Sequence, residues 1–273
     1  MHALNIFELP YVLSGFCVGA LVGMTGVGGG SLMTPLLILL FGVNPATAVG
    51  TDLLFAASTK TVGSLIHGVS RTIDWRIVGR LAAGSIAGTT ITLLALSTLD
   101  FESAEARRAI TITLACVLCL TSTLLFFSGR LIRWHVKYVR ELDPKNISLL
   151  TIAFGVLVGI LVTATSVGAG AIGVIVLVLL YPQVPMARIV GSDIAHAVPL
   201  TLMAGSGHWL LGSINWYLLV TLLAGSIPGI VVGSYFAGRT ADHVLRIILA
   251  AVLIIVAVRL EPISKLLVVA DGL

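Results

Sequence analysis

Residues 21–35 read Leu-Val-Gly-Met-Thr-Gly-Val-Gly-Gly-Gly-Ser-Leu-Met-Thr-Pro, in the middle of the apolar segment Tyr11 to Phe41. Glycine adds little apolar burial, and inside a helix it is about 1 kcal/mol less favourable than alanine. A glycine cluster at this place therefore predicts a break in the chain path, where a plain membrane-crossing helix would avoid one.

Composition indicates a membrane protein. Hydrophobic residues make up 58% of the 273 residues, charged residues make up 10%, and the mean hydropathy is +1.09. An ordinary soluble surface needs roughly a quarter or more charged residues. Apolar runs of about 20 residues recur, which predicts an all-α integral membrane protein. The net charge of +4 is assigned to membrane-facing loops, because lysine and arginine lie mostly between apolar runs, and no nucleic-acid binding is expected.

The length of the first apolar segment favours a hairpin. Tyr11 to Phe41 as one straight helix would be about 46 Å long, whereas the hydrocarbon core is about 30 Å thick. A break at Gly26 to Gly30 would leave two short arms that meet near the bilayer centre. We therefore predict a re-entrant hairpin, with its irregular backbone packed against protein or facing a water-filled cavity.

The second half of the sequence repeats the first. Gly19 to Gly30 aligns with Gly159 to Gly170 at a shift of 140 residues, and later landmarks align at a shift of 141. These later pairs are Gly50 with Gly191, Asp52 with Asp193, His67 with His208, and Trp75 with Trp216. Such duplication is a recurring construction of secondary transporters.

The orientation of the two halves depends on the opening segment. A single crossing would give parallel repeats, whereas a hairpin gives an odd number of crossings and inverted repeats. Segment length and glycine placement favour inversion. The predicted fold is two pseudo-symmetric inverted repeats, residues 1–128 and 147–273, each a broken re-entrant hairpin followed by three transmembrane helices. Residues 129–146 form a basic connector, expected to be cytoplasmic.

A polar stripe runs along the segment Ala46 to His67. At about 100° per residue, one helix face carries Asp52, Thr59, Lys60, Gly63 and His67. The repeat places Asp193, Thr201, Ala204 and His208 on the matching face, with His196 beside it. A charge at membrane depth costs on the order of 3 kcal/mol, so this face is expected to line a pathway inside the protein.

Lys60 is the sharpest single candidate, because its repeat partner is Thr201 and its charge is therefore not a remnant of duplication. We predict that Lys60 neutralises an anionic substrate. The broken helices would add backbone N–H groups and hydroxyls at the start of each second arm, where the helix dipole favours an anion. The predicted substrate-binding residues are Lys60, Thr25, Gly28, Gly29, Gly30, Ser31, Thr165, Ser166, Gly168 and Gly170, with Asp52, Asp193, His67, His196 and His208 as coupling or second-shell groups.

Alternatives remain at each of these positions. Lys60 can form a buried ion pair with Asp52 or Asp193 that only fixes helix packing, and the two aspartates can cap the starts of their own helices. The histidines can be hydrogen-bonded packing residues, and the glycines can serve close helix contacts. The stripe of Asp and His side chains also suits a divalent-metal or proton-conducting permease, although Lys60 argues against a cation site. No catalytic constellation, metal site or cofactor is predicted, and the chain is not expected to be an enzyme.

The sequence resembles the sulfite exporter TauE/SafE family over nearly its whole length. The resemblance lies in the Gly23 to Pro35 segment, in Ala48-Val49-Gly50-Thr51-Asp52-Leu53, and in Val190-Gly191-Ser192-Asp193. It implies a bacterial inner-membrane permease for small sulfur-containing anions such as sulfite, sulfoacetate or other organosulfonates, coupled to a proton or sodium gradient. The expected partners are thus the anion, H+ or Na+, and membrane lipid; a homodimer is left open.

Overall fold

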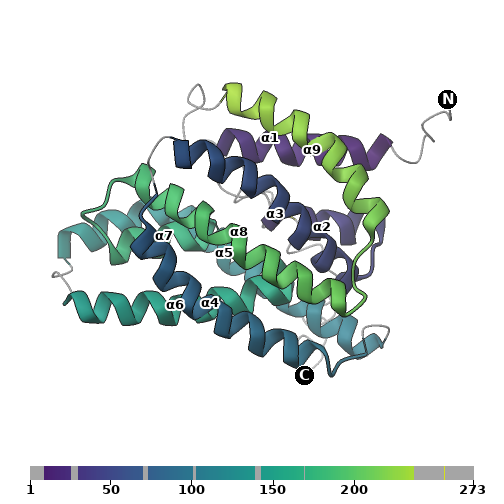
Figure 1. Cartoon of the computed structure of the whole chain (residues 1–273), viewed down its shortest axis with the longest axis horizontal. Coiled ribbons are helices and arrows are strands. Elements are labelled where there is room, and N and C mark those ends of the chain that lie inside the picture. Colours follow the sequence, from purple (N-terminus) through teal and green to yellow (C-terminus); the bar gives the residue numbers. More distant parts are fainter. Residues whose placement is uncertain are drawn as a thin grey trace, which may run out of the picture.

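The computed structural model describes residues 9–25, 30–69, 73–100, 103–138, 143–168, 170–236 and Ile255. Within these residues the chain is all-helical, with nine α-helices and no β-strand (Figure 1). The helices are α1 (Leu9–Thr25), α2 (Gly30–Phe41), α3 (Pro45–Val69), α4 (Trp75–Leu96), α5 (Ala104–Tyr138), α6 (Pro144–Thr165), α7 (Ala171–Leu180), α8 (Met186–Leu210) and α9 (Trp216–Phe236).

Two helix pairs flank a central pair. In Figure 1, α1 and α9 lie side by side along one edge, α4 and α6 lie along the opposite edge, and α3 and α8 lie between them. The central pair carries the polar stripe that the sequence predicts. The outer pairs therefore separate much of the charged face from the surroundings.

Glycines bring the outer pairs into backbone contact. A Cβ atom at Gly15 or Gly19 of α1 would collide with the carbonyl oxygen of Leu222 or Ser226 on α9. Small residues of this kind let membrane helices approach closely and gain van der Waals contact.

The same contacts recur in the other pair. A Cβ atom at Gly155 or Gly159 of α6 would collide with the carbonyl oxygen of Leu81 or Ser85 on α4. Gly155 and Gly159 follow Gly15 and Gly19 by 140 residues, and Leu81 and Ser85 precede Leu222 and Ser226 by 141. The first half of the chain thus supplies α1 to one pair and α4 to the other, and the second half supplies α9 and α6 in the matching roles.

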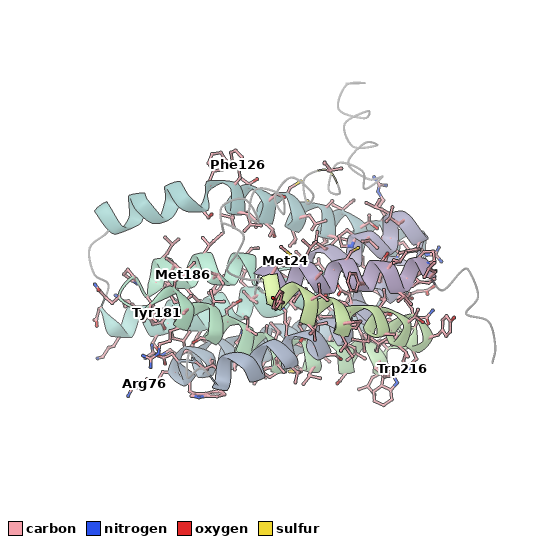
Figure 2. The ribbon with its side chains drawn as sticks, turned by 90° about the horizontal axis from the view of Figure 1, so that it is seen from above. Met24, Arg76, Phe126, Tyr181, Met186 and Trp216 are labelled. Carbon is pink, nitrogen blue, oxygen red and sulfur yellow. The ribbon has the colours of Figure 1, made fainter. Side chains whose placement is uncertain are left out.

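Four of the described helices, α4, α5, α6 and α9, are long and apolar enough to cross a membrane, and α1 and α2 are apolar but shorter. Exposed aromatic side chains stand toward the two ends of the long dimension. In Figure 2, Tyr181 and Arg76 lie toward one end and Trp216 toward the other. Aromatic residues are enriched where a membrane meets water, so the long dimension follows the expected membrane normal.

The predicted break in Tyr11 to Phe41 corresponds to the boundary between α1 and α2. Residues 26–29, which include three of the clustered glycines, lie outside the described residues. Met24, near the end of α1, lies close to the middle of the molecule in Figure 2. In the second half, α6 ends at Thr165 and α7 begins at Ala171, so a break follows at the matching place.

Helix α5 runs on from the predicted fourth span into the basic segment. It is continuous over 35 residues, from Ala104 to Tyr138, which is about 52 Å and exceeds the hydrocarbon core. The predicted boundary at residue 128 falls within this helix. The basic segment therefore begins as a direct extension of a membrane-crossing helix.

Apolar packing holds α2 inside the protein. Leu32, Met33 and Leu37 of α2 pack with Leu114 and Leu118 of α5 in the largest buried cluster. A short helix wholly surrounded by other helices suits the prediction that the second arm of the hairpin is enclosed by protein.

Candidate functional site

The two aspartates of the polar stripe occupy equal positions in two equal helices. Asp52 is the eighth residue of α3 and Asp193 the eighth of α8, and each helix has 25 residues. Both side chains are buried. The alternative that they cap their own helices is wrong, because α3 begins at Pro45 and α8 at Met186.

Asp52 instead contacts the start of a neighbouring helix. Its Oδ2 atom accepts hydrogen bonds from the hydroxyl of Thr34 at 2.5 Å and from the backbone N–H of Thr34 at 3.1 Å. Thr34 lies in the N-terminal part of α2, where the helix dipole favours a negative charge. The second oxygen, Oδ1, is buried without a hydrogen-bond partner.

Asp193 makes the matching contact with α7. The backbone N–H of Gly170, the N-cap residue of α7, donates to the Asp193 carboxylate. A Cβ atom at Gly173 would collide with the same carboxylate, so glycine is required there for the close approach. The Oδ2 atom of Asp193 is buried and has no hydrogen-bond partner.

Lys60 lies between these groups on α3 and is 5% exposed. It interacts electrostatically with Asp193 and, more weakly, with Asp52. Among the described residues it forms no hydrogen bond and no salt bridge within 4.0 Å. The predicted alternative of a close packing ion pair is therefore not what these residues form. The repeat partner of Lys60, Thr201, donates its hydroxyl to the carbonyl of Ala197 on its own helix at 2.7 Å.

The connection between α6 and α7 links the two aspartates. Ser166 ends α6 in the left-handed conformation, with φ of 60°, and Gly168 and Gly170 have φ of 121° and 112°. Ser166 lies beside Asp52, although its buried hydroxyl meets no partner at hydrogen-bond geometry. Gly170, at the other end of the connection, binds Asp193. One irregular turn thus contacts both halves of the stripe.

Thr165 is engaged within this turn. Its hydroxyl donates to the carbonyl of Leu161 at 2.7 Å and accepts from the N–H of Val167 at 3.2 Å. The predicted substrate donor Thr165 therefore stabilises the turn, and Ser166 is the hydroxyl that remains unpartnered beside Asp52.

The two described histidine side chains are buried and hydrogen-bonded. The Nε2 atom of His196 lies 2.9 Å from the hydroxyl of Ser85 on α4. The Nε2 atom of His208 lies 2.9 Å from the carbonyl oxygen of Thr163 on α6. Because a carbonyl only accepts, Nε2 of His208 carries the proton, and its Nδ1 atom is buried without a partner. Both rings thus join α8 to the pair formed by α4 and α6.

Several predicted site residues lie outside this description. Gly28 and Gly29 are not among the described residues, and the side chains of Thr25, Ser31 and His67 are likewise not described. Gly30 is the first residue of α2. The residues brought together are Lys60, Asp52, Asp193, Ser166 and Gly170.

Sequence reasoning missed three residues of the site: Thr34, Ser85 and Gly173. Thr34 belongs to the quoted glycine-rich stretch, and a hydroxyl one turn after the break was a usable signal for it. Ser85 and Gly173 gave no such signal, because a serine and a glycine inside apolar helices are ordinary packing residues.

The arrangement combines one unpaired cation with several unsatisfied acceptors and donors in the protein interior. A buried ammonium without a hydrogen-bond acceptor is unfavourable, and a small anion that reached Lys60 would supply the acceptor. Within the described residues, no group of three His, Cys, Asp or Glu side chains is placed to hold a metal ion.

Comparison with known proteins gives a consistent picture. A family model described as sulfite exporter TauE/SafE matches residues 11–260. The probable membrane transporter protein YjnA of Bacillus subtilis (strain 168) is 37% identical over 256 residues, covering 93% of this chain and 99% of the relative. The probable membrane transporter protein YdhB of the same organism is 28% identical over 244 residues, covering 86% and 92%. A probable membrane transporter protein of Xylella fastidiosa (strain 9a5c) is 24% identical over 254 residues, covering 90% and 91%. No solved structure matches the chain.

Proposed function

Because the chain belongs to the sulfite exporter TauE/SafE family, we propose that it is a secondary transporter that moves small sulfur-containing anions across the bacterial inner membrane. The substrate class comprises sulfite, sulfoacetate and other organosulfonates, and transport is coupled to an ion gradient. The family and the names of the relatives indicate a membrane transporter, and a permease is favoured over an enzyme.

Lys60 is the observation that carries the anionic substrate. Its ammonium group is buried, it has no hydrogen bond among the described residues, and its nearest charges lie beyond salt-bridge distance. A sulfonate or sulfite oxygen would accept from this ammonium in a charge-assisted hydrogen bond. The hydroxyl of Ser166 is the second donor proposed for the anion.

Transport is proposed to proceed by alternating access in two inverted repeats. Support comes from the outer helix pairs, in which glycine contacts recur at shifts of 140 and 141 residues, and from the equal placement of Asp52 and Asp193. In such folds the substrate binds near the membrane centre, where broken helices end. The turn from Ser166 to Gly170, together with the glycine-rich stretch after Thr25, is proposed to form that region.

The proposal is tested by uptake into proteoliposomes that contain the purified full chain. Labelled sulfite, sulfoacetate and methanesulfonate are offered separately, with imposed pH or sodium gradients and with protein-free liposomes as the control. We expect uptake of at least one sulfur anion, reduced by unlabelled sulfonates and unchanged by divalent metal ions. Competition by metal ions without any anion uptake would instead support a cation permease.

A further inference from the structure

Asp193, and not Asp52, is the main counter-charge of Lys60. The interaction of Lys60 with Asp193 exceeds that with Asp52. Asp52 lies eight residues before Lys60 on the same helix, which is about 12 Å along the helix axis. This inference rests on the proposed function, because it concerns what happens to Asp193 when an anion reaches Lys60.

Asp52 is stabilised independently of Lys60. Both donors of Thr34 bind its Oδ2 atom, and the start of α2 adds a favourable dipole. Among the interactions of Asp52, the one with Lys60 is the smallest. The charge of Asp52 can therefore persist whether Lys60 faces a carboxylate or a substrate.

Asp193 depends on Lys60 to a greater degree. Lys60 is its strongest favourable interaction, ahead of the single N–H donor of Gly170. Its Oδ2 atom is buried and has no hydrogen-bond partner. If Lys60 turned to another anion, Asp193 would remain as a buried carboxylate with one hydrogen bond, which is unfavourable in a membrane interior.

We propose that Asp193 is the proton-binding group of the transporter. An anion that binds Lys60 displaces Asp193 as its counter-charge, and Asp193 takes up one proton from the solution to which the site is open. Lys60 and Asp193 together are neutral when the site is empty. Lys60, a bound monoanion and protonated Asp193 are also neutral together. The anion and the proton then leave on the opposite side, so that both cross in the same direction without net charge.

Other titratable groups face α8 from the helices packed against it. They are Asp52 and Lys60 on α3, Arg76 and Arg80 at the start of α4, and Lys145 at the start of α6, with His196 and His208 on α8 itself. Arg80 is bound to the hydroxyl of Tyr181 at 3.1 Å, and the two histidines are bound to Ser85 and Thr163. Asp193 is the one of these groups whose main partner is the residue that receives the anion.

The test uses the full chain in proteoliposomes with labelled methanesulfonate, which stays a monoanion over the working pH range. One pH unit is worth about 1.36 kcal/mol, so symport of one proton should concentrate the anion about tenfold inside vesicles with the more alkaline interior. A membrane potential, worth about 2.3 kcal/mol per charge at 100 mV, should leave this ratio unchanged. A trapped pH dye should report one proton entering per anion.

The informative variant is Asp193→Asn, which keeps the shape of the side chain and removes its titration. We expect the accumulation ratio to fall from about ten to about one, while exchange of labelled for unlabelled methanesulfonate across the membrane continues. Asp143→Asn is the matched control, because Asp143 is an exposed N-cap of α6 and asparagine caps equally well. This control should keep both accumulation and exchange.

Contrary results separate the two proposals. Proton-driven accumulation retained by Asp193→Asn, or lost in His196→Gln alone, would show that Asp193 is not the proton-binding group. Accumulation that follows a sodium gradient or the membrane potential in the unmodified protein would also overturn the proposal, and this measurement needs no folded variant. Failure of the unmodified protein to exchange either methanesulfonate or sulfite would instead reject the anion-transport function itself.

Discussion

The hydroxyl and the backbone N–H of Thr34 donate to the same oxygen of Asp52, so that one residue of α2 holds a buried carboxylate of α3. Charge-assisted hydrogen bonds of this kind are stronger than neutral ones. The contact fixes the start of the short helix α2 against the polar stripe. It also occupies a place at which the sequence suggested that a substrate anion binds.

Thr34→Val should therefore destabilise the protein. Valine keeps the shape of the side chain but removes the hydroxyl donor, which leaves the buried carboxylate with one hydrogen bond fewer and costs about 1–3 kcal/mol. Thermal unfolding in detergent measures the loss. Thr113→Val is the control, because Thr113 is exposed and bonds only to the carbonyl of Ala109 on its own helix. Equal stability of the two variants would contradict the role given to Thr34.

Lys60→Met should reduce anion uptake by at least about tenfold, equivalent to about 1.4 kcal/mol, because methionine retains the volume but supplies no positive charge. Size-exclusion chromatography in detergent checks that the variant is folded. Lys145→Met makes the same substitution at an exposed residue of α6 and should leave uptake unchanged. Wild-type affinity in Lys60→Met would remove Lys60 from the proposed binding site.

Ser85 and Ser226 stand at equivalent places on α4 and α9, yet their hydroxyls differ. The hydroxyl of Ser85 bonds to His196, whereas that of Ser226 is buried without a partner. Ser85→Ala should destabilise the protein by about 1–3 kcal/mol because it leaves the imidazole unpaired, and Ser226→Ala should be neutral or stabilising. Thermal unfolding of the two variants side by side gives the answer, and the reverse order would show that the imidazole has another partner.

Gly84→Ala should impair packing of α4 against α6. The added methyl group would collide with the backbone carbonyl of Ile152, and overpacking of this kind costs about 1–3 kcal/mol or more. Gly79→Ala is the control within the same helix, because nothing lies within 4 Å of its added Cβ. Alanine forms helices better than glycine, so this control should match or exceed the unmodified protein in folded yield and melting temperature.

The hairpin is tested with membrane-impermeant thiol reagents on a chain from which Cys17, Cys116 and Cys119 have been replaced, because all three are exposed. Leu9→Cys and Val43→Cys flank α1 and α2. If these helices form a re-entrant hairpin, both sites should be labelled from the same side of the membrane. Arg76→Cys should be labelled from the other side. Labelling of the first two sites from opposite sides would mean a full crossing and would exclude inverted repeats.

The helices themselves could be predicted closely from the sequence. The polar span predicted at Ala46 to His67 is α3, Pro45–Val69, and the span predicted at Ile77 to Leu96 is α4, Trp75–Leu96. Long apolar runs bounded by proline or charged loops leave few other choices in a membrane. Lys60, Asp52 and Asp193 could be singled out for the same reason, since charges are rare at membrane depth.

The partners of these charges could not be predicted. Thr34 lies 18 residues from Asp52, and Ser85 lies 111 residues from His196. Which small polar residue meets which charge depends on how the helices pack, and periodicity within one helix carries no information about that. For the same reason, it could not be foreseen that aspartates would stand at the starts of α2 and α7, where an anion was expected.

Lys60 and Thr201 hold the sixteenth position in two helices of equal length, and this difference bears on why both halves reside in one polypeptide. A dimer of identical halves would have to carry two lysines or two threonines. Two lysines would neutralise both aspartates, and two threonines would neutralise neither. Fusion let a single site diverge, and with one lysine shared by two acidic residues, the odd charge becomes available for exchange with a solute and its proton.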